Sequence, residues 1–531
     1  MKSAPYRIGL LVDGSRVPKW VRDFADWANA HPQIDVAAFV IGPRPAQPAI
    51  LRPILALERL FLRFSGRYRP YLRLYPVHGG AAELKGIRAA KDGCVRLAEA
   101  DLAKLRALRL DLLVQCGNGM AAPALVAEAR DGMLFISPGS GGAAANGAQG
   151  LIDVVEGRLE TRFAIERAPA SAAPPETLFT GSVSTGLSYS ASTICVHARA
   201  FGYLRLVVER LARRNAEPVR NDRGLRVCQP FSSAQLLSYG ARTIGRSLGK
   251  AARRLSGRDF NWRVGFTRKP WIDGDWSDGT SIANPEGSFL ADPFTIAVDG
   301  THYIFVEEFR FKDRKGVIAA YRLHGDQPKR IGIVLEQAYH LSFPFVFRHA
   351  GDIFMVPESG AGRCVKLYKS TSFPAGWQEV KVLLEGVEAV DTIMFEHRGL
   401  WWMLTTIKGQ GPGLNSAELH AFHAPDPLGE WTAHRDNPVV MDARRGRNGG
   451  FLRDELGRPH RVAQIPGFTF YGAGASVFRI DELSPETYGE RLVTEVRPDF
   501  LPRLDGTHHI HSADGLTVYD FLRVERPGAK L

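Results

Sequence analysis

The sequence predicts a two-part chain: an α/β domain with a Rossmann-like parallel sheet, followed by an all-β domain built as a five-bladed β-propeller. Three observations carry this prediction. The 531 residues exceed what one ordinary hydrophobic core holds. Residues 1–165 alternate strand-like and helix-like segments, which favours a parallel sheet covered by helices. From residue 261 onward, alternating apolar runs recur in blocks of roughly 45–55 residues, a period typical of propeller blades.

The composition is that of a globular protein, with 45% hydrophobic and 23% charged residues. The net charge of +12 favours acidic partners such as phosphates, nucleotides or an anionic membrane, although a generally basic proteome explains it equally well. The five cysteines stand singly without a CxxC pair, which argues against a disulfide framework or a cysteine zinc site. The first apolar run is too short for a signal peptide, and no stretch has the length of a spanning helix, so we expect a cytoplasmic protein.

The α/β domain is predicted over residues 1–165, a connecting region over 166–260 and the propeller over 261–531. In the first domain, strands are expected at Tyr6–Val12, Ile34–Ile41, Asp111–Gln115 and Met133–Ile136, with helices between them. Loops at the carboxyl ends of such strands are where a ligand of an α/β domain binds.

Part of this domain resembles the formyltransferases that use formyl-tetrahydrofolate. The resemblance rests on Asp111-Leu112-Leu113-Val114, Ala127, Arg130, Gly132, Leu134 to Gly139, Val155-Glu156-Gly157 and Thr161. That family has an Asn-x-His-Pro-Ser segment, and here Phe135 stands in place of its Asn and Ser137 in place of its His. Because serine does not replace histidine as an acid/base group at neutral pH, the resemblance implies a formyltransferase-like shape without that chemistry.

Two segments combine apolar residues with a strong excess of arginine and lysine. Residues 50–74 carry six arginines opposed only by Glu58, and residues 241–258 carry six basic residues and no acidic one. Basic amphipathic helices of this kind favour membrane-peripheral contact, whereas a helix packed on its own domain with solvated arginines is the simpler alternative. Neither segment interleaves aromatic residues in the way that stacking platforms for bases require, so nucleic acid is not an expected partner.

The propeller sequence places carboxylates inside apolar strand patterns, where a charge is costly unless it faces a polar cavity. We expect blades to begin near Ser288, Arg330, Trp377, Trp431 and Arg491, with Trp262–Phe266 closing the last. Paired carboxylates are what glycosyl transfer or hydrolysis needs, so the predicted catalytic residues are Asp292, Glu358 and Asp391. The predicted substrate-binding residues are Glu308, His340, Trp402, Arg444 and Gln464.

This half resembles the N-terminal propeller domain of glucosamine inositolphosphorylceramide transferases, a domain similar in turn to five-bladed arabinanase and xylosidase propellers. The resemblance rests on Ala291–Phe294, His340–Phe345, Val356–Ser359, Leu367-Tyr368, Phe373-Pro374, Trp377, Val390-Asp391, Trp401-Trp402, His434, Asn437-Pro438, Ala443-Arg444 and Tyr471-Gly472. It implies an Asp, a second Asp and a Glu on successive blades. Asp292 matches the first, whereas Ser342-Phe343 stands at the second position and Asp391 at the third, which puts plain hydrolysis in doubt.

Three hypotheses follow. The first is a carbohydrate-active enzyme, a glycosyltransferase of glycolipid or surface-polysaccharide assembly, with a sugar or glycolipid substrate and peripheral membrane contact through 50–74 and 241–258. No cofactor is certain for it, and a nucleotide-sugar donor is the candidate. The second is an amino-sugar N-formyltransferase whose propeller holds the substrate. The third is a non-catalytic glycan-binding propeller fused to a decayed transferase domain.

Overall fold

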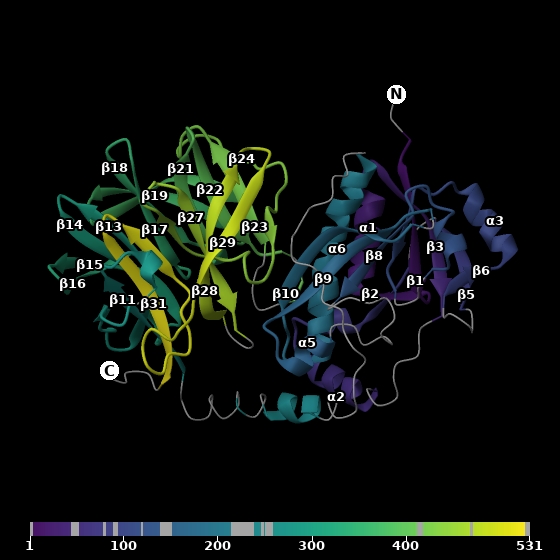
Figure 1. The fold of residues 1–531 in the computed structure, drawn as a ribbon, viewed down its shortest axis with the longest axis horizontal. Coiled ribbons are helices and arrows are strands. Elements are labelled where there is room, and N and C mark those ends of the chain that lie inside the picture. The colour runs from purple at the N-terminus through teal and green to yellow at the C-terminus, as the bar shows by residue number, and fades with distance from the viewer. Residues whose placement is uncertain are drawn as a thin grey trace. The chain divides into compact units, whose positions relative to one another are not determined.

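The computed structural model describes the chain apart from fifteen short stretches and single positions. These are residues 1–3, 44–51, 78–80, 89–93, 118–120, 139–150, 172, 214–237, 246–248, 250–258, 275, 410, 413–417, 468–470 and 526–531. Two compact units are present, one comprising residues 1–244 with 410–413 and the other comprising 245–409 with 414–531 (Figure 1).

The first unit is built on an eight-stranded mixed sheet with the strand order β10-β9-β8-β7-β1-β3-β5-β6. Its strands are β1 (Tyr6–Asp13), β3 (Ile34–Gly42), β5 (Ala82–Arg88), β6 (Val95–Leu97), β7 (Leu112–Gln115), β8 (Met133–Pro138), β9 (Glu160–Ala168) and β10 (Glu176–Ser184). The central strands β5, β3, β1, β7 and β8 are parallel, while β6, β9 and β10 pair antiparallel with their neighbours. The predicted α/β sheet is therefore confirmed, with antiparallel edges that the sequence pattern did not indicate. The sheet also continues past residue 165, through β10.

The helices of this unit follow the same chain order between the strands. They are α1 (Lys19–Ala30), α2 (Arg52–Leu62), α3 (Glu99–Ala107), α4 (Pro123–Val126), α5 (Leu151–Glu156) and α6 (Tyr189–Ala212), with a 3-10 turn at Arg69–Leu72 and a small ribbon of β2 (Arg16–Pro18) and β4 (Leu74–Pro76). Helix α6 begins at Ser188, whose hydroxyl accepts a hydrogen bond from the Ala191 N–H at 3.3 Å. It packs against α1, β9 and β10, and so covers the sheet (Figure 1).

The second unit is a five-bladed propeller, as predicted. Four blades each come from one continuous stretch, in the order inner to outer strand. The first is β13 (Ser288–Val298), β14 (Thr301–Arg310), β15 (Lys315–His324) and β16 (Gln327–Leu335), and the second is β17 (Ser342–His349), β18 (Asp352–Glu358), β19 (Cys364–Ser372) and β20 (Ala375–Glu385). The third is β21 (Ala389–His397), β22 (Leu400–Ile407), β23 (Glu418–Ala424) and β24 (Thr432–Ala433) with β25 (Val440–Met441), and the fourth is β26 (Asn448–Arg453), β27 (Pro459–Pro466), β28 (Tyr471–Leu483) and β29 (Tyr488–Val496).

The fifth blade joins the two ends of the propeller sequence. Its inner strands are β30 (Ile510–Ala513) and β31 (Leu516–Glu525), and its outer strands are β11 (Asp259–Thr267) and β12 (Thr280–Ile282), with short 3-10 turns at Trp271–Asp273 and Gly360–Gly362 elsewhere in the unit. Residues Asp259 to Thr267 pair in sequence with Glu525 to Thr517, so the predicted closure through Trp262–Phe266 is confirmed. Pairing the two ends of the propeller sequence within one blade closes the ring of blades.

Four of the predicted blade starts were wrong in phase. Arg330 lies in the outer strand β16, Trp377 in the outer strand β20 and Arg491 in the outer strand β29, and Trp431 precedes the outer strand β24. The spacing of these residues follows the outer strands, which repeat with the same period as the inner strands. The inner strands β13, β17, β21, β26 and β30 contact one another in a closed ring.

The inner strands of the first four blades share one backbone irregularity. The strand register shifts between Ala291 and Phe294, between Ser342 and Phe345, between Val390 and Ile393, and between Asn448 and Phe451. The first residue inside three of these bulges has a positive φ: 50° at Asp292, 47° at Phe343 and 53° at Asp391. Because β-bulges re-aim side chains beside active sites, these three positions are structurally equivalent candidates for a site.

Aromatic rings from all five blades pack together along the inner strands. Phe294 of β13 contacts Phe343 and Phe345 of β17 and the ring of His509, with centroid distances of 4.9, 5.3 and 4.5 Å. Phe451 of β26 stacks on Phe395 of β21 at 4.7 Å, and His511 of β30 contacts Phe294 at 4.9 Å. Burial keeps the pKa of His511 down at about 4, so this layer is uncharged at neutral pH.

Candidate active site at the centre of the propeller

A group of buried acidic side chains comes together beside the three bulges. We call it the carboxyl cluster and define it as five carboxyl groups and two cationic side chains: Asp292, Glu307, Glu358, Asp391 and Asp520, with Arg447 and His508. Asp292, Glu307, Asp391 and Asp520 are buried, and Glu358 keeps partial contact with solvent. The members come from all five blades, since β13 and β14, β18, β21, the start of β26 and β31 each contribute.

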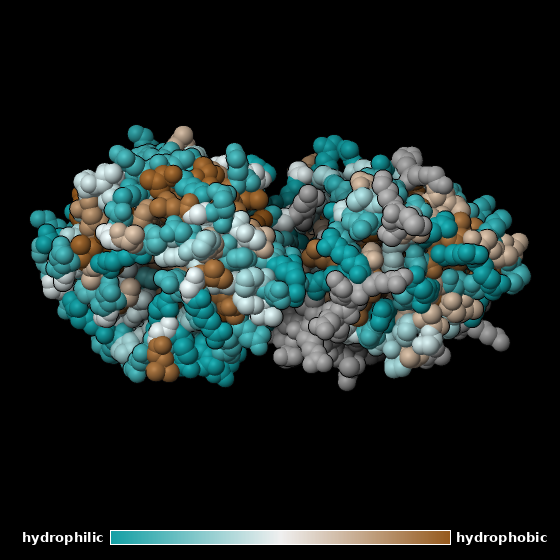
Figure 2. Space-filling view, turned by 90° about the horizontal axis from the view of Figure 1, so that it is seen from above, coloured by the Kyte–Doolittle hydropathy of each residue, from teal (hydrophilic) through white to brown (hydrophobic). Residues whose placement is uncertain are grey.

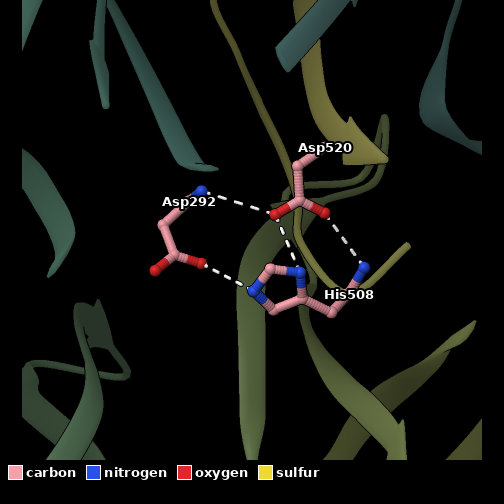
Figure 3. A group of neighbouring side chains, drawn as sticks. All are labelled: Asp292, His508 and Asp520. Atoms are coloured by element: carbon pink, nitrogen blue, oxygen red, sulfur yellow. Dashed lines mark hydrogen bonds and ion pairs between the residues drawn. The ribbon is translucent and has the colours of Figure 1, made fainter. Parts of the chain in front are cut away.

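One side of the cluster is a chain of two aspartates joined by a histidine (Figure 3). His508 Nε2 lies 3.1 Å from Asp292 Oδ1, and His508 Nδ1 lies 2.9 Å from Asp520 Oδ2. Asp520 also accepts hydrogen bonds from the backbone N–H groups of His508 and His509, both at 3.0 Å. Burial opposes a charge on His508, but the carboxylates of Asp520 and Asp292 outweigh burial and raise its pKa to about 10.

The imidazolium of His508 therefore neutralises part of the charge on Asp292 and orients its carboxylate. Asp292 and His508, together with Asp520, also lie close enough to serve as metal ligands, with one donor atom of each within 4.8 Å of the others. A metal ion would need the His508 nitrogen without its proton, whereas the two aspartates favour the protonated ring. We describe the group as an ion-paired relay, in which His508 holds Asp292 against Asp520.

The other side of the cluster is held by an arginine. Arg447 Nε donates to Asp391 Oδ2 at 2.6 Å, and Gln464 Nε2 lies 3.5 Å from the same oxygen. Asn448 donates its side-chain amide to the Asp391 carbonyl at 2.7 Å, which fixes the bulge. Burial disfavours the Arg447 charge, yet Asp391 raises the pKa of the guanidinium above its ordinary value, so this ion pair stays charged at neutral pH.

Two further carboxyl groups lie between these paired sides, and both gain protons easily. Burial raises the pKa of Glu358 to about 8, and the nearby charges of Asp391 and Asp292 add to the effect despite Arg447. Burial also raises the pKa of Glu307 well above its ordinary value, with Asp292 and Glu358 contributing next. At neutral pH the cluster thus offers the protonated carboxyl group of Glu358 beside carboxyl groups that contact a cation, the arrangement that acid/base chemistry needs.

Tyr471 borders the cluster and leaves 38% of its surface exposed. Its ring stacks on Trp262 at a centroid distance of 6.0 Å, and the Arg447 guanidinium lies 4.9 Å from its centroid. A partly exposed aromatic side chain beside carboxyl groups is suited to contact a sugar.

Five of the eight predicted site residues lie at or beside this cluster. Asp292, Glu358 and Asp391 are members, and Gln464 contacts Asp391. His340 is at its edge, because its Nδ1 accepts from the Gly316 N–H at 2.9 Å and its Nε2 lies 3.4 Å from Glu307 Oε1.

The structure places the other three elsewhere. Glu308 forms an ion pair with Arg330 of the outer strand β16 at 2.8 Å, since adjacent strand residues point to opposite faces and Glu307 occupies the inner one. Trp402 is buried in the hydrophobic core of the propeller. The Arg444 side chain bonds Glu495 at 2.8 Å at a half-exposed position.

The predicted set of site residues did not include Glu307, Arg447, Tyr471, His508 or Asp520. Asp520 had a usable signal, because it is a lone carboxylate inside the apolar run Val518 to Leu522, the same pattern that pointed to Asp292. Arg447 had none, since it stands among other arginines in a loop-like stretch.

In the first unit, the positions singled out by the formyltransferase resemblance carry no imidazole. The Ser137 hydroxyl donates to Glu166 Oε2 at 2.5 Å, and Phe135 packs against the core of the sheet. The resemblance of this unit to formyltransferases remains a prediction.

The fold and the cluster together define a five-bladed propeller with a buried group of carboxyl side chains contributed by all five blades. Residues 277–499 match the family model described as glucosamine inositolphosphorylceramide transferase 1, N-terminal, which confirms the predicted resemblance for that region. The chain is 30% identical over 267 residues to the glucosamine inositolphosphorylceramide transferase 1 of Oryza sativa subsp. japonica, covering 47% of this chain and 34% of the rice protein. It is 36% identical over 209 residues to that of Arabidopsis thaliana, covering 38% of this chain and 27% of that protein.

The chain thus spans about a third or less of the length of these curated relatives. Solved structures that overlap the propeller include the catalytic domain of the Coprinopsis cinerea GH62 α-L-arabinofuranosidase, at 11% identity and a TM-score of 0.34, covering 46% of this chain and 93% of that one. The Cellvibrio cellulosa α-L-arabinanase overlaps at 14% identity and a TM-score of 0.32, covering 44% and 90%.

Proposed function

We propose that this protein is a glycosyl-transferring enzyme of glycolipid or surface-polysaccharide assembly whose propeller binds a glycosyl group against the carboxyl cluster. The observation that carries the proposal is the split between Glu358, with a pKa of about 8, and the carboxylates of Asp292 and Asp391, which contact His508 and Arg447. A proton donor beside ionised carboxylates is the pair that glycosyl transfer or hydrolysis uses. The matched plant relatives, named as transferases that act on inositolphosphorylceramide, support a sugar-bearing lipid as the substrate class.

In this proposal each group has one task. Glu358 gives its proton to the oxygen that leaves the anomeric carbon as that bond breaks. Asp292 takes the proton of the acceptor hydroxyl as the new bond to the anomeric carbon forms, and His508 positions Asp292 without touching the substrate. Tyr471 and His340 bind the sugar at the rim. A nucleotide sugar is the candidate donor.

The test is a transfer assay with a panel of nucleotide sugars and sugar-bearing lipids, including glucosamine inositolphosphorylceramide, followed by mass spectrometry of the products. We expect Glu358→Gln to lose at least about 100-fold in kcat, because the amide has no proton to give. Wild-type turnover should fall as the pH rises through about 8, where Glu358 loses its proton. Full turnover by Glu358→Gln on every accepted substrate would overturn the assignment.

A second candidate is a glycan-binding module without turnover, and the observation that favours it is Phe343. This side chain stands at the bulge position where the neighbouring blades carry Asp292 and Asp391, so the second blade supplies no carboxylate there. Glycan binding by titration calorimetry that is lost in Asp292→Asn, with no product from any donor, would select this candidate over the enzyme.

A further inference from the structure

Helix α2 carries an apolar face that no described part of its own unit covers. Leu57, Leu60, Phe61 and Phe64 recur at the spacing of one helix face, and the hydrogen bond from the Phe64 N–H to the Phe61 carbonyl continues the helical turn. These side chains are exposed, with 67% of Phe61 and 84% of Phe64 accessible. A cluster of large apolar side chains on one exposed helix face is the kind of feature that marks an interaction site.

The opposite face of α2 is firmly attached to the unit. Leu55 is buried, and Glu58, the single acid of this segment, is buried as well and accepts hydrogen bonds from the Ser190 N–H at 2.8 Å and from the Tyr239 hydroxyl. The outward direction of the apolar face is therefore set by packing, since rotating the helix would expose Leu55 and break the bonds to Glu58.

Arginines are the charged residues beside this face, and Glu58 is the one acid in the sequence from residue 52 to residue 73. Arg52, Arg59 and Arg63 share the flank between the buried and the apolar faces, and Arg67, Arg69 and Arg73 follow; all six are exposed. Within the described residues, Arg59, Arg63, Arg69 and Arg73 form no ion pair with a carboxylate. Because Glu58 is buried, the exposed surface of the segment is purely cationic and apolar.

The second basic segment lies beside the first. Helical residues 238–245 are tied to α2 through Tyr239, whose hydroxyl also accepts from the Tyr189 N–H at 2.8 Å, and Arg242 donates to the Val155 carbonyl at 2.8 Å. Ile244 on this helix is 59% exposed. Of the predicted segment 241–258, residues 246–248 and 250–258 lie outside the described residues.

We propose that the exposed face of α2, together with helical residues 238–245, is a docking surface for an anionic lipid bilayer. Phe61, Phe64, Leu57 and Leu60 enter the boundary between headgroups and acyl chains, while the arginines contact lipid phosphates. Charge complementarity selects this occupant. Residues 52–73 carry six exposed arginines and their one acid, Glu58, is buried, so their exposed charges match the phosphates of an anionic lipid surface. None of the described helices is long and apolar enough to cross a bilayer, so the contact is peripheral.

The experiment is flotation of the full chain with vesicles of phosphatidylcholine, with and without about one third phosphatidylserine. We expect binding to the anionic vesicles that weakens at least tenfold between about 0.1 and 0.5 M salt. The variant Phe61→Ser with Phe64→Ser should lose at least tenfold in partition coefficient, and Arg59→Gln with Arg63→Gln should lose the preference for anionic vesicles. Amide hydrogen exchange should show protection of residues 52–64 on vesicle addition.

The matched control removes two exposed leucines from the other unit, Leu428→Ser with Leu456→Ser, and should bind as the wild type does. Equal binding by the wild type and the phenylalanine variant would overturn the proposal, and so would equal binding to neutral and anionic vesicles. Lipid-free self-association that is lost in the phenylalanine variant would assign the surface to a second copy of the chain instead. The vesicles contain no sugar, so these outcomes are independent of the proposed glycosyl transfer.

Discussion

The inner strands of the first and second blades of the propeller contain the same β-bulge, but the side chains at the bulge differ in chemistry. Both inner strands have a bulge whose first residue has φ near 50°, Asp292 in one and Phe343 in the other. Aspartate tolerates this conformation because its short polar side chain bonds locally, whereas phenylalanine is rarely found there. The surrounding packing therefore holds Phe343 in place, with Phe294 and His509 at 4.9 and 5.0 Å.

The difference teaches that the ring provides equivalent positions and that the chemistry is distributed unevenly among them. The blades with Asp292 and Asp391 contribute carboxylates that pair with His508 and Arg447. The second blade instead contributes an apolar ring to the layer beneath, and its acidic group comes from the next strand, as Glu358. A proton donor on a different strand from the two carboxylates is consistent with unequal roles for the three groups.

The largest expected effect comes from removing the charge at the first blade. Asp292→Asn should lower turnover in the transfer assay by about 1,000-fold, because the amide cannot accept a proton from the acceptor. Circular dichroism and the melting temperature of the variant check that the propeller remains folded. Turnover within about threefold of the wild type would show that Asp292 has no role in the chemistry. The first and second blades would then not differ in function at this position.

Placing the first blade's side chain on the second blade is the next largest change. Phe343→Asp should reduce the free energy of unfolding by about 3 kcal/mol, since it deletes buried aromatic contacts and adds a carboxylate to an acidic neighbourhood. Denaturant unfolding measures the change, and Phe343→Leu, which keeps an apolar side chain, should cost less. A variant as stable as the wild type would show that the two blades are interchangeable.

The relay behind Asp292 predicts a dependence of stability on pH in the alkaline range. The pKa of His508 is raised to about 10, above the value of roughly 6.5 expected in the unfolded chain, so its contribution is present in full below pH 6.5 and is lost as the pH rises through 10. His508→Gln should remove on the order of 2 kcal/mol of the wild-type loss between pH 7 and pH 10. The exposed His324→Gln serves as the control and should keep the wild-type profile.

The smallest effect is expected outside the cluster. Arg444→Ala should change the free energy of unfolding by less than about 0.5 kcal/mol and leave turnover unchanged, because its half-exposed ion pair with Glu495 is screened by solvent. A loss of turnover above about tenfold would mean that the carboxyl cluster extends to this loop of the fourth blade.

The surface of the molecule gives a second contrast, between the propeller and α2. Seen from above, hydrophobic side chains form separate patches on a mostly hydrophilic surface (Figure 2). Some exposed apolar residues of the propeller, such as Ile331 and Ile333, lie on the outer strand β16, where Lys329 and Arg330 precede them in the sequence. Those of α2 adjoin only arginines on the exposed side, which is why the lipid proposal concerns α2.

The sequence by itself determined the propeller, its closure and the carboxylates Asp292, Glu358 and Asp391 as candidates. The period of the strands and the cost of a charge inside an apolar run are local properties, so each can be recognised from a single segment of the sequence. The sequence did not show whether Glu307 or Glu308 faces the carboxyl cluster, because the pattern of β14 is apolar on both faces. Only the packed blades show which face is the inner one.

Tertiary structure alone decided the partners of those carboxylates. The Asp292 N–H bonds Asp520 across 228 residues of sequence, and Arg447 reaches Asp391 across 56. Such pairs form because closing the ring brings separate blades to a common centre. A buried charge is costly there unless an opposite charge lies beside it, because it has lost its contact with water. Residue spacing along the chain does not show which residues of different blades lie close together in space. The His508 relay and the ion pair between Arg447 and Asp391 therefore became visible only in the folded propeller.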